Sequence, residues 1–166
     1  MGLTYAQIEL VNVDDQALAR SKFLLAPKIR RTRVKALVDS GAGSLAINAG
    51  SLAINERIQK KLGLPRLRTG IAELADGSRI AVEVVGPVGV HFKNRETVAY
   101  AHVLPGNAEP LLGVIPREDM DLVLHPKKQL LGVNPANPDQ PIIKLKRSMI
   151  QPASTAGDGS CCRFPD

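Results

Sequence analysis

The sequence predicts a mainly β protein, a small closed β structure with one or two short helices. Apolar or alternating stretches recur between turn-forming residues along most of the chain, which is the pattern of many short strands. Of the 166 residues, 44% are hydrophobic but only 3% are aromatic, and there is no Trp. A chain of this length can bury a core without disulfides, and that core must be aliphatic.

The expected strands follow one another at intervals set by turns. Residues 5–13 alternate apolar and polar side chains, as a half-buried strand does. Asp14 and Asp15 are expected in a turn, and residues 16–32 in irregular structure, with residues 23–25 a short strand candidate. Further strands are expected at residues 34–38, 69–75, 79–85, 87–92, 97–104, 122–124 and 129–133.

Two segments predict helix, and one dipeptide predicts a hairpin. In residues 55–62, Ile58 and Leu62 share one helical face, and Gly63 follows as a C-terminal stop. Residues 117–120 predict a helical turn. Asp76-Gly77 predicts a β-hairpin between residues 69–75 and 79–85, because both turn positions need positive φ.

The organisation along the chain is one domain over residues 1–133 and a tail over residues 134–166. Residues 134–141 contain three prolines, and residues 148–166 are rich in Ser, Gly, Pro and Ala, so we expect a disordered tail. Cys161 and Cys162 are adjacent, a spacing that rarely forms a disulfide and that fits no metal site. They predict tail thiols in a reducing cytoplasm.

Charge and hydropathy set the expected partners and location. The net charge is +6, and basic residues cluster at residues 28–35, 60–61 and 144–147. No aromatic side chains are interleaved for base stacking, so we interpret these clusters as solvated faces and do not expect nucleic acid as a partner. No segment has the features of a signal peptide or the roughly 18 consecutive apolar residues of a membrane span. A cytoplasmic protein without membrane contact is expected.

An acidic residue, Asp39, ends the apolar stretch of residues 34–38. A carboxylate at the end of a buried strand is costly unless it has partners. Gly41 lets the backbone turn sharply, the small neighbours allow a second chain to approach, and the Ser40 hydroxyl can form a hydrogen bond across that contact. Taken alone, Asp-Ser-Gly also fits an ordinary turn.

Four motifs in fixed order give Asp39 its context: ALVDSGA, KKLGL, LADGSRI and PLLGVIP. Together, over about residues 3–132, they resemble the retroviral-type (retropepsin-like) aspartic proteases, most closely their small bacterial relatives. The resemblance implies a small closed retropepsin-like β-barrel. It also implies roles for named residues: Asp39 as the catalytic acid; Ser40, Gly41 and Ala42 as the active-site loop; Ala75, Asp76, Gly77 and Ser78 as the flap over the substrate; Leu111, Leu112 and Gly113 as packing behind the active-site loop.

The same resemblance implies a symmetric homodimer that cleaves peptide bonds. In such enzymes two neighbouring carboxylates share one proton and activate a water, with no metal and no cofactor. This chain has one Asp-Ser-Gly, and Asp119 and Asp121 are expected in solvated or capping roles. The second acid is therefore expected to be Asp39 of another copy, and the substrate an extended peptide or protein segment.

Two rival functions stay open. One is a catalytically silent dimeric module that binds extended peptides. The other is a basic adaptor that binds peptides or RNA through residues 28–35. Other nucleophiles and ligands have less support: His91, His102 and His125 are scattered and expected to be structural or on the surface, and Ser44 and Ser51 lack a Gly-x-Ser-x-Gly context.

An internal repeat adjoins Asp39. Residues 42–48, AGSLAIN, recur as residues 49–55, and removing one copy leaves the spacing that the resemblance expects. We expect the first copy to keep the native strand and the second to extend the helix, from near Ser51 as N-cap to about Leu62. Seven residues are nearly two helical turns, so Ile54 would join the stripe of Ile58 and Leu62. A loop bulge at residues 48–50 is the alternative.

Overall fold

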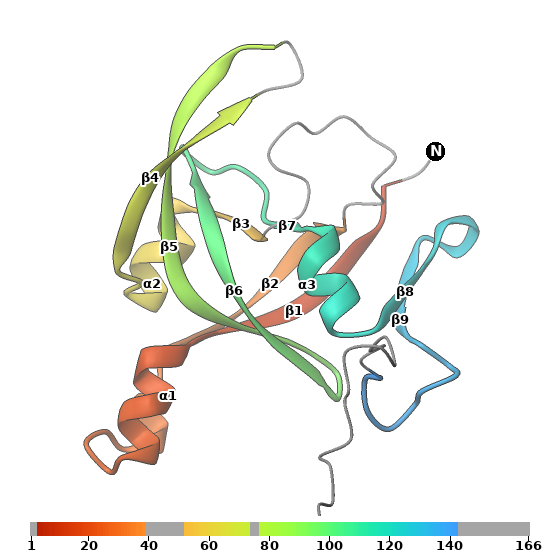
Figure 1. Cartoon of the computed structure of the whole chain (residues 1–166), viewed down its shortest axis with the longest axis horizontal. Coiled ribbons are helices and arrows are strands. Elements are labelled where there is room, and N and C mark those ends of the chain that lie inside the picture. The colour runs from red at the N-terminus through yellow and green to blue at the C-terminus, as the bar shows by residue number, and fades with distance from the viewer. Residues whose placement is uncertain (1–2, 39–51, 74–76, 143–166) are drawn as a thin grey trace, which may run out of the picture.

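The computed structural model describes residues 3–38, 52–73 and 77–142, and it is mainly β with few helices (Figure 1). The strands are β1 (Tyr5–Asn12), β2 (Arg31–Val38), β3 (Leu52–Asn55), β4 (Arg66–Glu73), β5 (Arg79–Phe92), β6 (Arg95–Leu104), β7 (Leu111–Leu112), β8 (Leu122–His125) and β9 (Leu130–Val133). The helices are α1 (Val13–Arg20), α2 (Glu56–Leu62) and α3 (Val114–Asp119), with 3-10 turns at Ala26–Lys28 and Pro126–Lys128.

One large sheet and one small one hold these strands. The order in the large sheet is β1-β2-β7-β3-β6-β5-β4, and β1 also pairs with β5. The pairing therefore runs from β1 round to β5 and back to β1 as a ring of strands, from which β4 extends as an edge. The antiparallel pair of β8 and β9 is separate.

An aliphatic row crosses the large sheet and forms part of the core. Its members are directly paired across five neighbouring strands, so they point to one face. They are Val38 (β2), Leu112 (β7), Leu52 (β3), Ala101 (β6) and Val85 (β5), all buried. This confirms the aliphatic core that the composition predicted.

β5 joins two segments that the sequence predicted as separate strands, residues 79–85 and 87–92. It is one long strand, and it changes its neighbour along one edge: β4 pairs with it up to Val85, and β1 pairs with it from Val88. Pro87 lies between the two regions, where the β5–β6 register also shifts. Because proline has no N–H to donate to a ladder, the change of partner falls where the strand tolerates it.

α1 lies where the sequence predicted a turn and irregular chain, so that prediction is wrong, as is a strand at residues 23–25. Asn12 caps the helix, since its Oδ1 accepts a hydrogen bond from the Asp15 backbone at 3.0 Å. Acidic residues in the first turn suit the helix dipole. The only residue that α1 buries is Asp15, so the helix has no apolar periodicity to reveal it.

The repeat folds differently from our expectation. Residues 52–55 are extended as β3, and α2 begins at Glu56 with Asn55 as N-cap, so a helix starting near Ser51 is wrong. Leu52, Ala53 and Ile54 are all buried. A strand covered on both faces buries three consecutive apolar residues, whereas one face of a helix does not. The second copy thus supplies the strand, and the first copy lies outside the described residues. Gly63 ends α2 in the left-handed conformation, as predicted.

Candidate functional site

The predicted site falls partly outside the described residues. Asp39, Ser40, Gly41 and Ala42 lie there, as do Ala75 and Asp76 of the predicted flap. The structure describes the strands on either side of these segments, together with Gly77, Ser78 and the Leu111-Leu112-Gly113 motif. We call the described strand ends that flank these segments the frame of the site.

The frame consists of three short strand ends. Val38, the last residue of β2, pairs in parallel with Leu112 of β7, and Leu52, the first residue of β3, pairs antiparallel with the same Leu112. β7 thus lies between the strand that leads into Asp39 and the strand formed by the end of the second repeat copy. Two backbone bonds fix the end of β2: the Leu37 and Val38 N–H groups donate to the carbonyls of Pro110 and Thr4, each at 2.8 Å.

The sheet has a second face at this point, opposite the aliphatic core row. Directly paired residues one position along point to this other face. They are Leu37 (β2), Leu111 (β7), Ala53 (β3), His102 (β6) and Val84 (β5). The two leucines of the motif therefore have different environments: Leu112 belongs to the core row, and Leu111 lies on the second face.

His102 is a member of this second face that the sequence had left as structural or surface. Its side chain is half-buried. Burial and the positive charge of Arg68 lower the pKa of the imidazole, and a backbone hydrogen bond with Leu52 opposes them. The lowered pKa favours the neutral form of the ring. No local sequence pattern indicates this position of His102, because the position depends on the pairing of β6 with β3.

The predicted hairpin is confirmed, and its strands reach beyond the rest of the large sheet (Figure 1). The last paired residues are Glu73 and Arg79, so the connection is longer than a two-residue turn. Gly77 has φ of +82°, as the turn prediction required, and no atom of the described residues lies within 4 Å of the position of a Cβ there. On β4, Ile71 is 75% exposed. The hairpin therefore presents an apolar side chain to solvent.

Gly113 follows β7 and precedes α3. It is buried, and its φ of −74° lies in the ordinary region, so the glycine is not required by a left-handed backbone. β7 and α3 follow one another with Gly113 between them. The motif thus occupies a buried position beside both strands that flank residues 39–51.

The acidic residues Asp119, at the end of α3, and Asp121, after it, have side-chain partners. The Asp121 carboxylate accepts hydrogen bonds from Nδ2 of Asn134 at 2.9 Å and of Asn137 at 2.6 Å, which lower its pKa. Asp119 accepts a hydrogen bond from the Thr97 hydroxyl. The sequence predicted solvated or capping roles for Asp119 and Asp121, and the structure shows that both carboxylates also have side-chain partners.

Arg95 is a second residue that sequence reasoning missed. It is almost fully buried, at 1% exposure, and its Nη2 donates to the Asn137 carbonyl. The neighbouring Asn94 donates through Nδ2 to the carbonyls of Pro138 and Asp139 at 2.9 and 3.2 Å. The β5–β6 turn therefore holds residues 137–139, which form no helix or strand, against the domain.

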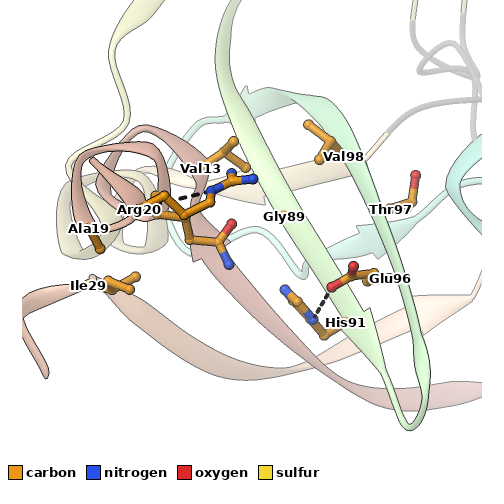
Figure 2. Close-up of a pocket in the computed structure, with 10 residues that line it drawn as sticks. Val13, Ala19, Arg20, Ile29, Gly89, His91, Glu96, Thr97 and Val98 are labelled. Atoms are coloured by element: carbon orange, nitrogen blue, oxygen red, sulfur yellow. Dashed lines mark hydrogen bonds and ion pairs between the residues drawn. The ribbon is translucent and has the colours of Figure 1, made fainter. Parts of the chain in front are cut away.

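A groove of about 670 Å³ lies between α1 and the β5–β6 hairpin (Figure 2). Arg20 reaches into it from α1, and His91 Nδ1 lies 3.4 Å from the Glu96 carboxylate (Figure 2). The groove adjoins the end of the β1–β2 pair at which Val11 pairs with Arg31. Val38 lies at the opposite end, next to the pairing of Tyr5 with Leu37. The β1–β2 pair spans roughly 20 Å at the usual rise of a strand. The groove contains none of the predicted site residues.

The described residues contain neither a cluster of metal-ligating side chains nor a membrane-spanning helix. No group of three or more His, Cys, Asp or Glu side chains in the described part of the chain could hold a metal ion. Across residues 3–38, 52–73 and 77–142, every helix is too short or too polar to cross a bilayer. No protein-family model matches the chain, and a search of curated proteins finds no match.

Proposed function

We propose that this chain is an aspartic endopeptidase with a retropepsin-like closed β-barrel, active as a symmetric homodimer. The observation that carries the proposal is the placement of β7 between β2 and β3. The strand that leads into Asp39-Ser40-Gly41 and the buried Leu111-Leu112 strand lie side by side, as the resemblance requires of a motif that packs behind the active-site loop. The two motifs are about seventy residues apart in the sequence.

The end of β2 bears on the role proposed for the Asp39 carboxylate. Val38 points into the core row and Leu37 to the second face. The face of Leu37 and Leu111 lies opposite the aliphatic core row. The proposal requires the Asp39 carboxylate to meet its symmetry mate from a second chain on that face, outside the aliphatic core.

The chemistry follows from two such carboxylates. Like charges so close cannot both ionise, so the pair holds one proton between two macroscopic pKa values. The ionised oxygen takes a proton from water, which attacks the peptide carbonyl, and the shared proton moves to the substrate and then to the leaving nitrogen. The β4–β5 hairpin would cover an extended substrate as the flap. A reducing cytoplasm suits Cys161 and Cys162.

Digestion of a peptide library at acidic pH tests the proposal. The wild-type chain, with and without an aspartic-protease inhibitor such as pepstatin, is compared with Asp39→Asn. We expect cleavage by the wild type only and a loss of at least about 1,000-fold in Asp39→Asn, because the pair loses its base. Asp14→Asn, which changes an exposed acid on α1, is the matched control and should keep the wild-type activity. Cleavage by a contaminating protease would appear equally in the Asp39→Asn preparation.

Two outcomes would reject the proposal. One is a folded Asp39→Asn variant that keeps most of the activity. The other is peptide binding without cleavage by the wild type across the pH range, which would instead assign the silent peptide-binding module.

A further inference from the structure

The repeat gives the chain two possible versions of β3. The described strand is built from the second copy, Leu52–Asn55, and each of its residues has an identical counterpart seven positions earlier, in residues 45–48. Identical side chains can make identical contacts. The question is whether the rest of the fold distinguishes the copies.

The contacts of β3 depend on side chains that both copies provide. Leu52 and Ile54 are fully buried, with 0% exposure, and β3 pairs with β6 on one side and β7 on the other. Asn55 adds a hydrogen bond from its Nδ2 to the Ala108 carbonyl at 3.0 Å. Residues 45–48 carry the same Leu, Ala, Ile and Asn in the same order, so they can fill the core and make this bond equally well.

We propose that the first copy can replace the second in β3, so that the chain has two strand registers seven residues apart. In the described register, residues 39–51 connect β2 to β3. In the alternative register, residues 39–44 make this connection, and residues 49–55 lie between β3 and α2. The helix keeps its cap in both, because the bond from the Ile58 N–H to Asn55 Oδ1, 3.0 Å long, is local to α2.

The difference between the registers lies in the two connections. The alternative register shortens one loop and opens another at the junction of Asn55 and Glu56, which are adjacent in the described register. Loop-closure entropy depends on the logarithm of loop length, so moving seven residues changes the populations by a factor on the order of 10. The described register is favoured, and the alternative is a minor state that a modest bias can make dominant.

The exchange bears on the site, and this part rests on the proposed function. The alternative register gives the spacing between Asp39 and β3 that the family resemblance expects. The repeat would then regulate the same site, with the short-connection register the active one.

Matched substitutions in the two copies test the exchange. Ile54→Asp puts a charge at a fully buried position of the described register, and Ile47→Asp makes the same change in the first copy. With exchange, both single variants fold cooperatively, because either can use its unaltered copy, and only the double variant fails to fold. Circular dichroism and denaturant melts give the readout. The folding constant of Ile54→Asp should fall by no more than about 100-fold.

A single-copy chain, lacking residues 42–48, provides the second control. It should fold, and with Asp at its one remaining β3 isoleucine it should not. The inference is overturned if Ile54→Asp is as unfolded as the double variant while Ile47→Asp is native. It is also overturned if the double variant or the single-copy Asp variant folds, because β3 would then tolerate the charge.

Peptidase assays on the same variants separate this inference from the proposed function. Ile54→Asp should cleave peptides several-fold faster per folded chain than the wild type, and Ile47→Asp should lose most of the activity. If no variant cleaves peptides but the folding pattern holds, the register exchange stands and the proposed function fails. If the wild type cleaves peptides but Ile54→Asp does not fold, the proposed function stands and the register exchange fails.

Discussion

At the scale of single residues, the fold depends on a few buried polar side chains as well as on its aliphatic core. Asn12 both caps α1 and donates through Nδ2 to the Leu62 carbonyl at 2.9 Å, which ties the first helix to the end of the second. Asp15 accepts three hydrogen bonds from Arg30, from its backbone N–H at 3.0 Å and from Nε and Nη2 at 2.7 Å. These contacts position α1 and the start of β2.

The Asp15–Arg30 pair leads to a stability prediction. Asp15→Asn should lower the free energy of unfolding at pH 7 by about 2 kcal/mol, because charge-assisted hydrogen bonds to a buried carboxylate are lost. Asp14→Asn, which alters an exposed neighbour, should change it by less than about 0.5 kcal/mol. Urea denaturation of the three proteins measures both effects.

The pH dependence of that difference provides a further check. Hydrogen bonds from Arg30 lower the pKa of Asp15 in the folded state, so the unfolded state binds more protons in acid. The stabilisation is present above the unfolded pKa of about 3.9 and is lost as pH falls toward the folded value. The difference in unfolding free energy between the wild type and Asp15→Asn should therefore become smaller below about pH 4. A gap that stays constant down to pH 3 would contradict the assignment.

At the scale of elements, the sequence predicted those whose signals are local. Alternation located β1, the Asp76-Gly77 pair located the β4–β5 hairpin, and Gly63 marked the end of α2. α1 was missed because its buried residue is an aspartate and its apolar residues follow no stripe. The repeat misled us because helical phase was weighed without the competing burial of Leu52 and Ile54 between β6 and β7.

The same distinction between local sequence signals and long-range strand pairing applies to the candidate site. The Leu111-Leu112-Gly113 motif was found from its letters, and the structure gives the two leucines opposite faces. His102 was not found, because its place beside Ala53 depends on a parallel pairing of strands about fifty residues apart. Arg95 was not found, because an arginine at a predicted turn gives no signal of burial.

β7 is short, and its residue Leu112 lies in the core row between β2 and β3, so a substitution there should be costly. Leu112→Ala should cost about 3 kcal/mol of unfolding free energy, since it opens a cavity in the core row between β2 and β3. Leu130→Ala, at a position 53% exposed on β9, is the control and should cost less than about 1 kcal/mol. Equal costs in thermal or urea melts would show that β7 does not hold the ring of strands together.

At the scale of the whole molecule, the pairing of β1 with both β2 and β5 joins the elements that flank residues 39–51 into one ring. The sequence contains a single Asp-Ser-Gly motif, which directly follows β2, and therefore one candidate catalytic acid of this kind. Asp119 and Asp121, which follow the Leu111-Leu112-Gly113 motif in the sequence, accept hydrogen bonds from Thr97 and from Asn134 and Asn137 respectively. The proposed chemistry therefore requires a second chain, and it makes the activity a property of the dimer.

Mixing experiments test that requirement. If each active site takes one Asp39 from each chain, adding an equal amount of Asp39→Asn to a fixed amount of wild type should about halve the activity, since random pairing leaves half the wild-type chains in wild-type dimers. Dilution of the wild type alone should lower its activity more steeply than its concentration, as dimers dissociate. An equal amount of an inert protein is the control, and sedimentation velocity at the assay concentrations reports the dimer directly. Unchanged activity in the mixture, together with a fully active monomer, would show that one chain contains both acids.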